Sequence, residues 1–118
     1  MYEIKYESTD PNVESKSINM YDEEGKALGR LQYTINGGTA QIGTFSINEW
    51  QNLYAERLLS RFLVHMKRRK VNQVSVELYH TDNTSHKKLL LFKSKGFIVE
   101  SGGNITGYHQ YFLKKQMK

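Results

Sequence analysis

The residues with the clearest chemical potential lie at a predicted strand-to-helix junction, FSINEWQNLYAERLL, residues 45–59. Backbone N–H groups at the start of a helix attract anions, and glycines in such a junction let the chain approach a phosphate closely. This junction has no glycine, because the 52 residues from Thr44 to Lys95 are entirely glycine-free. The sequence therefore predicts a weakened anion site that depends on helix N–H groups alone.

Two starting points for this helix compete. If Asn52 caps the helix, residues 48–51 form a short loop and the N–H groups of residues 53–56 point outward. If Asn48 caps it, Gln51 takes the third helical position as a capping-box partner, and little room is left for an anion. The sequence alone does not choose between these two starts.

Basic residues further along the helix suggest a second, electrostatic contribution. Arg57 and Arg61 lie one and two turns in, where they could support phosphates, although an exposed helix face is the simpler interpretation. The run at 67–70, KRRK, could contact nucleic-acid phosphates. Basic residues are also favoured at a helix C-terminus, and no aromatic residues interleave with the run, so nucleic acid is not the favoured partner.

Metal and thiol chemistry are not expected. The chain has no cysteine, which excludes disulfides and thiolate ligands. Its histidines lack a short ligand spacing such as His-x-x-x-His. These histidines are His65, His80, His86 and His109.

Hydrophobic periodicity predicts the elements that position these residues. An amphipathic helix is expected over about 51–69, and a second helix over about 85–95 ends at Gly96. Asn36-Gly37-Gly38 predicts a hairpin turn, and Gly102-Gly103-Asn104 a second turn. The expected strands cover residues 2–8, 16–22, 26–35, 39–47, 71–79, 96–101 and 105–115.

The order of the elements is four strands, helix, strand, helix and two strands. A strand–helix–strand unit inside an otherwise antiparallel sheet implies a mixed sheet with a crossover helix on one face. We predict a single α+β domain over 1–118, with one mixed, mostly antiparallel sheet of about seven strands and two helices packed on it.

The segment LLLFKSKGFIVE, residues 89–100, resembles the Leu-Tyr-x-x-x-Gly-Phe signature of the GNAT superfamily of acyl-CoA-dependent N-acetyltransferases. The order of elements over about 26–114 is also similar to that family. Three features depart from it. The segment that matches the phosphate loop lacks the glycines. Phe92 stands where many members have a tyrosine that acts as a general acid, and the seven residues 9–15 stand in place of an N-terminal pair of helices.

The resemblance implies an acyl-CoA cosubstrate, with no metal, and an amine acceptor of unknown identity. It suggests Tyr79, His80 or Glu77 as the proton-transferring group, since they end the strand that lines the family's reaction cleft. The coenzyme contacts that it implies are Phe45, Ser46, Ile47, Gln51, Asn52, Leu53, Tyr54, Ala55, Arg57, Asn83 and Phe92.

Composition limits the remaining possibilities. No apolar run approaches the length of a membrane span, and MYEIKYES lacks the pattern of a signal peptide, so a cytoplasmic protein is expected. Residues 1–59 carry 5 basic and 9 acidic side chains, whereas residues 60–118 carry 12 basic and 3 acidic ones. The basic half suggests an anionic partner. The leading hypothesis is an N-acetyltransferase; the alternatives are an inactive GNAT-like binding module and a nucleic-acid-binding protein. A homodimer stays open.

Overall fold

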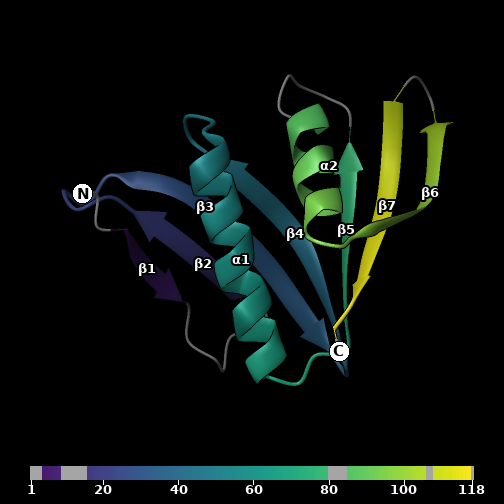
Figure 1. Cartoon of the computed structure of the whole chain (residues 1–118), viewed down its shortest axis with the longest axis horizontal. Helices are drawn as coiled ribbons and strands as arrows, with labels where there is room; N and C mark the ends of the chain where they lie inside the picture. The colour runs from purple at the N-terminus through teal and green to yellow at the C-terminus, as the bar shows by residue number, and fades with distance from the viewer. Residues whose placement is uncertain (1–3, 9–15, 80–84, 106–107, 118) are drawn as a thin grey trace.

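The computed structural model describes residues 4–8, 16–79, 85–105 and 108–117. Within these ranges one mixed sheet of seven strands carries two helices (Figure 1). The elements in chain order are β1 (Lys5–Ser8), β2 (Lys16–Tyr21), β3 (Ala27–Asn36), β4 (Thr39–Ile47), α1 (Asn52–Arg68), β5 (Gln73–Tyr79), α2 (Ser85–Ser94), β6 (Ile98–Ile105) and β7 (Tyr108–Gln116). The predicted α+β class and the predicted order of elements are confirmed.

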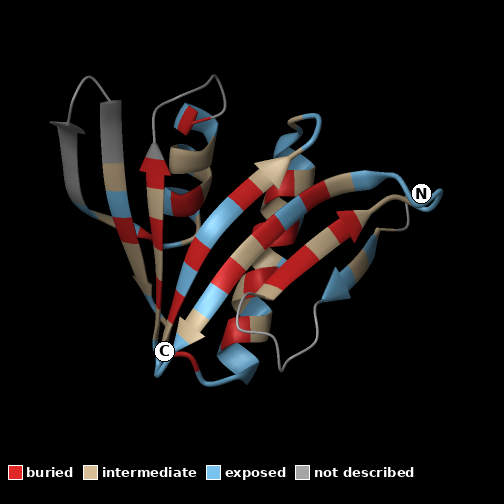
Figure 2. Ribbon diagram, turned by 180° about the vertical axis from the view of Figure 1, so that it is seen from behind, coloured by how far each residue is buried: buried red, intermediate tan, exposed pale blue. Residues whose placement is uncertain are grey.

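The sheet has the strand order β1-β2-β3-β4-β5-β7-β6. All neighbours are antiparallel except β4 and β5, which run parallel because α1 forms the crossover between them. Both helices cover the same face, and the view from behind shows the strands unobstructed (Figures 1 and 2). The expected absence of an N-terminal helix pair concerns residues 9–15, which lie outside the described residues.

The hairpin between β3 and β4 forms where the sequence predicts it. Gly37 has a φ of 63°, a conformation that costs glycine little and other residues more. Asn36 pairs with Thr39 directly across this turn. The register of the two strands is thereby set from the turn inward, so that Leu31 faces Phe45 across the pair on the helix-covered side.

A β-bulge at Gly43 shapes the centre of the sheet. Tyr33 pairs with Ile42 and Gln32 with Thr44, so Gly43 is the extra residue on β4. A bulge bends its strand and increases the local twist. Parallel pairing of β4 with β5 ends at Ile42 opposite Val76, immediately before the bulge. Beyond that point the two strands diverge toward their carboxyl ends (Figure 1).

The core fills the space between the sheet and α1. One side of α1 is buried, and the ring of Phe62 meets Tyr33 of β3 edge-on at 5.1 Å between centroids. The buried residues of α1 are Ala55, Leu58, Leu59, Phe62 and Met66. Their spacing matches the predicted apolar face, so hydrophobic burial fixes how the helix lies on the sheet.

The end of α2 is fixed by a cap that the sequence predicts. Gly96 has a φ of 91°, its N–H donates to the carbonyl of Lys93 at 3.0 Å, and the Phe97 N–H donates to the carbonyl of Phe92 at 3.0 Å. These two hydrogen bonds form a Schellman motif, in which residues on either side of the cap usually make an apolar contact. The rings of Phe92 and Phe97 make that contact at 4.9 Å.

The predicted turn at Gly102-Gly103-Asn104 is wrong. These residues belong to β6 and pair with Tyr111, Gln110 and His109 of β7. Turn-forming residues give only a local preference, and backbone pairing with a long neighbouring strand overrides it here. Because β6 is an edge strand, glycines there need not pack a side chain between two strands.

Candidate functional site

The first turn of α1 is open. Gln51 is the N-cap, in an extended conformation (φ −135°, ψ 128°) and without a side-chain capping hydrogen bond. The first intrahelical bond runs from the Ala55 N–H to the Gln51 carbonyl at 3.1 Å. The N–H groups of residues 52–54 therefore have no acceptor within the helix, and the first turn contains no acidic residue.

Neither predicted helix start is correct, although the loop before the helix is close to the first alternative. Asn48 does not cap α1, because the helix begins at Asn52; its backbone N–H donates to the Leu28 carbonyl at 2.9 Å and its side-chain amide to the Ala27 carbonyl at 2.7 Å, which ties it to β3. Asn52 lies inside the helix and accepts a 2.7 Å hydrogen bond from the Trp50 indole N–H. This hydrogen bond stabilises the loop before α1, which stands where a phosphate loop would contain glycines.

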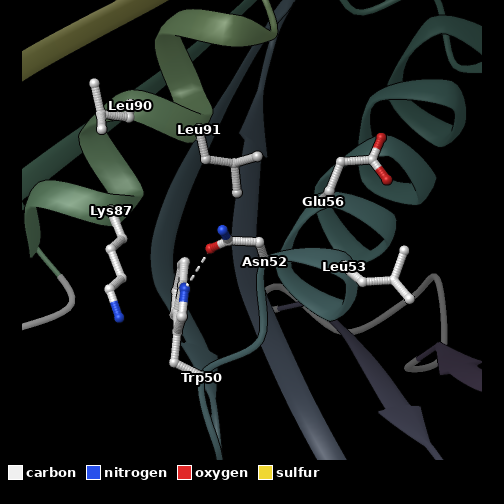
Figure 3. Close-up of a pocket in the computed structure, with 7 residues that line it drawn as sticks. All are labelled: Trp50, Asn52, Leu53, Glu56, Lys87, Leu90 and Leu91. Carbon is white, nitrogen blue, oxygen red and sulfur yellow. Dashed lines mark hydrogen bonds between the residues drawn. The ribbon is translucent and has the colours of Figure 1, made fainter.

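A groove of about 540 Å³ runs between the first turns of α1 and α2 (Figure 3). Lys87 lies on one wall and Glu56 on the other, and the remaining lining is mostly apolar. The lining residues are Trp50, Asn52, Leu53, Glu56, Lys87, Leu90 and Leu91. Both helices begin at the end of the sheet where β4 and β5 diverge (Figure 1), and Asn52 and Leu53 of α1 and Lys87 of α2 bring their first turns to the groove.

Only part of the glycine-free junction lines the groove. Among the predicted coenzyme contacts in the junction, Asn52 and Leu53 line the groove. Gln51 and Tyr54 instead line a separate cavity of about 130 Å³ beside β3, and Ala55 is buried in the core. The helical periodicity explains this division, because successive residues of α1 point in different directions.

Arg57 is not brought to the groove. It is exposed, and its charge acts on Tyr6 of β1, whose pKa is raised mainly by burial and is lowered in part by Arg61 and Arg57. The sequence prediction did not include Trp50 and Lys87. The tryptophan stands inside the quoted junction, and its aromatic ring next to a helix start was the available signal.

An ion pair joins the two helices beside the groove. The Lys95 ammonium lies 2.6 Å from a Glu56 carboxylate oxygen, which also accepts a 3.0 Å hydrogen bond from the Ser60 hydroxyl. The hydrogen bond from Lys95 lowers the pKa of Glu56 below its usual value, against a smaller opposing effect of burial. The carboxylate lines the groove, and its charge is partly offset by Lys95.

We expect Lys95→Met to lower the free energy of unfolding at neutral pH by up to about 1 kcal/mol, since the pair is partly exposed to solvent. A depressed carboxyl pKa stabilises the fold above the unfolded pKa of about 4.3 and ceases to do so as pH falls through the folded pKa. The difference between wild type and variant should therefore vanish in acid. Urea unfolding across pH measures it. Lys26→Met, which removes an exposed pair at 3.9 Å to Glu49, should have no measurable effect at any pH; equal losses in both would contradict the assignment.

A second cavity, of about 260 Å³, lies where β4 and β5 diverge. Its lining combines core residues with polar residues of the uncovered face of the sheet. The lining residues are Ile42, Gly43, Thr44, Phe45, Ser46, Val76, Glu77, Leu78, Ser85 and Lys88. Among the described residues, the pairing of β4 with β5 does not continue beyond Ile42, and the following residues of β4 border the cavity.

Several predicted site residues meet at this cavity and others do not. Phe45, Ser46 and Glu77 line it, whereas Ile47 does not and lies against Gly29 of β3. Ser85 and Lys88, from the start of α2, are lining residues that the sequence prediction did not include. Glu77 alternates with the buried Val76 and Leu78 and therefore lies on the uncovered face of β5.

The other proposed proton-transferring residues are not placed. Tyr79 is the last residue of β5 and pairs with Gln110, and its side chain lies outside the described part of the structure. His80 and Asn83 also lie outside the described residues. Their roles remain predictions.

Phe92 belongs to the core and lines neither cavity. Its side chain is fully buried, with the rings of Phe45 at 5.5 Å and Phe97 at 4.9 Å, both edge-on. The residue therefore holds the end of α2 against β4. The residues that resemble the family signature therefore form a helix cap and an aromatic cluster in this protein.

The divergent parallel strands, the crossover helix and the order of the sheet define the fold of the GNAT superfamily of N-acetyltransferases. The chain is similar to the ribosomal-protein-S18-alanine N-acetyltransferase from Escherichia coli, with 9% identity, 98% of this chain and 95% of that chain covered, and a TM-score of 0.83.

Other solved structures show the same likeness. Nourseothricin acetyltransferase matches at 10% identity over 98% of this chain and 85% of its own, with a TM-score of 0.75. The aminoglycoside 6′-N-acetyltransferase from Enterococcus faecium matches at 11% identity over 91% and 77%, with a TM-score of 0.74. No protein-family model and no curated protein matches the sequence. At these identities the comparisons establish the fold.

Among the described residues, no group of three or more His, Cys, Asp or Glu side chains could hold a metal ion. No helix in the described ranges is long and apolar enough to cross a lipid bilayer.

Proposed function

We propose that the protein is an acyl-CoA-dependent N-acyltransferase. The groove between α1 and α2 would hold the phosphates of the coenzyme, and the cavity between β4 and β5 would be the place of acyl transfer to an amine. The observation that carries the proposal is the open first turn of α1 together with the cavity between β4 and β5, on a fold shared with acetyltransferases.

The groove fits a phosphate-bearing ligand. The unbonded N–H groups of residues 52–54 and the positive end of the helix dipole favour an anion, and no acidic residue stands in the first turn. Lys87 adds a positive charge on the opposite wall, while the nearest carboxylate, Glu56, is already paired with Lys95. Backbone donors therefore supply what glycines and a dedicated loop supply in other phosphate sites.

The β4–β5 cavity fits an amine and a thioester together. Acyl-CoA, when bound, supplies the activated acyl group. Glu77 can accept the proton of the attacking amine, directly or through water, because it faces the cavity from the uncovered side of the sheet. The hydroxyl groups of Thr44 and Ser46 on the opposite wall can orient the amine. Phe92 has no proton to give to a departing thiolate, so Tyr79 and His80 stay candidates for that role.

A charge placed in the first turn of α1 tests the groove. Leu53 is 53% exposed, so Leu53→Glu removes little packing, and an acidic residue near a helix N-terminus stabilises the helix by about 0.3–1 kcal/mol. We expect the melting temperature to be unchanged or slightly higher. The affinity for CoA should fall at least about tenfold, because the new carboxylate opposes the phosphates at close range.

The matched control is Val64→Glu. Val64 is 50% exposed on the same helix and does not line the groove, so this variant should bind CoA like the wild type. Titration calorimetry with CoA and with acetyl-CoA measures both. If the wild-type protein binds neither compound, the proposed function is wrong. If wild type and Leu53→Glu bind CoA with equal affinity, the phosphates of CoA do not bind in this groove.

A further inference from the structure

A second concentration of positive charge lies on α1 beyond the groove. Arg61, His65 and Arg68, at positions i, i+4 and i+7, share one side of the helix, and we call them the arginine stripe. Residues 52–70 contain six Lys or Arg side chains and a single acidic one, Glu56, which is paired with Lys95. The helix thus carries a large excess of positive charge.

The arginine stripe borders a cleft rather than a flat surface. A cavity of about 220 Å³ lies between it and the first two strands, with Ser8 of β1 and Ile18 of β2 on the far side. All three members of the stripe line this cavity, together with Val64. The cleft faces β1 and β2, whereas the groove of the proposed coenzyme site faces α2.

One guanidinium group of the stripe is held in place by an aromatic ring. The Arg61 Cζ lies 4.6 Å from the centre of the Tyr6 ring on β1. A guanidinium that interacts with an aromatic face still has N–H groups for an anion. Because Tyr6 restricts its rotamers, Arg61 loses less conformational freedom when it binds a ligand.

Among the described residues, no acidic side chain forms an ion pair with the stripe. Within the described residues the three ion pairs shorter than 4.0 Å join lysines to glutamates, and none includes the stripe. The pKa of His65 is lowered by burial and then by the charges of Arg69, Arg61 and Arg68. Tyr6, Ser8 and Ile18, which face this region from β1 and β2, supply no negative charge at neutral pH.

We propose that the cleft between the arginine stripe and β1–β2 binds a phosphate group, independently of the coenzyme groove. Arginine forks match the oxygens of phosphate and bind them in a bidentate manner. Arg61 and Arg68 stand about 10 Å apart along the helix axis with His65 between them, and all three line the cleft. The Ser8 hydroxyl can complete the site from β1.

The phosphate group can belong to a small phosphorylated molecule or to the backbone of a single-stranded nucleic acid. Both present phosphate oxygens to the stripe, but they differ in how much of the protein surface they contact. A small molecule contacts only the cleft. A nucleic-acid strand continues onto the neighbouring basic residues Arg57 and Arg69 and shows a strong dependence on salt.

The experiment follows the His65 imidazole by NMR while inorganic phosphate is added at constant ionic strength. Bound phosphate should raise the pKa of His65, because an anion favours the protonated imidazole. Arg61→Gln/Arg68→Gln should weaken phosphate binding at least tenfold. The control Arg30→Gln/Lys93→Gln removes the same charge from exposed positions on β3 and α2 and should bind phosphate like the wild type.

A single-stranded RNA oligonucleotide forms the second arm. Salt-sensitive competition with phosphate at His65 identifies a nucleic-acid source, and phosphate binding without competition identifies a small phosphorylated ligand. Melting temperatures verify folding, and Arg68→Gln alone keeps the Arg61–Tyr6 contact if the double variant unfolds. An imidazole pKa that phosphate does not change, or an equal loss in the control, overturns the proposal. The affinity for CoA should be the same in all these variants, which separates this test from that of the coenzyme groove.

Discussion

Replacing Phe92 with alanine is expected to lower the free energy of unfolding by about 3–5 kcal/mol, the range for truncating a large buried aromatic side chain. The side chain is fully buried between Phe45 of β4 and Phe97, the residue before β6. Its loss leaves a cavity that these rings cannot fill without moving. The variant also removes the apolar contact across the Gly96 cap.

Urea unfolding followed by circular dichroism measures this loss. Phe112→Ala is the matched control, because Phe112 is the same residue type on β7 but is 38% exposed on the uncovered face. It should cost well under half as much as Phe92→Ala. Similar losses for the two variants would show that the aromatic cluster does not hold α2 on the sheet. If Phe92→Ala does not fold at all, Phe92→Leu, which keeps most of the volume, gives a smaller measurable loss.

Replacing Glu77 with glutamine is expected to lower kcat/KM for transfer to an amine by about 10²–10⁴-fold, the usual contribution of a general base. Glutamine has nearly the same shape and cannot accept the proton. The affinity for acyl-CoA should not change, because Glu77 lies on the uncovered face of β5 and does not line the groove between α1 and α2.

Release of free CoA in the presence of a panel of primary amines measures the rate. Glu100→Gln serves as the control, because this carboxylate is also partly exposed but is paired with Lys114 at 3.0 Å, outside the cavity. It should leave the rate unchanged. If Glu77→Gln retains the wild-type rate, the proton goes to another group. Tyr79 and His80 are then the residues to substitute, and the rates of those variants are compared with that of the wild type.

Hydrophobic periodicity determined most of the fold. Apolar residues at alternate positions in the first four strands, and at Leu58, Phe62 and Met66, specify local structure because burying them on one face is the dominant stabilising term. The turn at Asn36-Gly37-Gly38 and the cap at Gly96 were equally predictable, since few other residues adopt their backbone conformations. The turn expected at residues 102–104 failed because these residues extend β6 and pair with β7, the next strand in the chain.

The candidate site was predictable only in part. Glu77, Phe45 and Ser46 were predicted because the resemblance to the GNAT superfamily implies that the ends of these strands line the reaction cleft, and all three line the cavity between β4 and β5. Trp50 stands in the predicted junction and could have been included, whereas Lys87 could not, since it is far from the junction in the chain and lines the same groove only when both helices lie on the sheet (Figure 3).

The sequence by itself determined the class of fold, the positions of both helices and the lack of glycine at the helix start. The tertiary structure decided what those features mean. The bulge at Gly43 opens β4 from β5, and the hydrogen bonds of Asn48 to β3 place the start of α1 at residue 52. Phe92 matches a position of the family signature in sequence, yet packing makes it a core residue. Local patterns specify elements, whereas cavities and charge clusters arise from contacts between residues far apart in the chain, and those contacts form only when the core is packed.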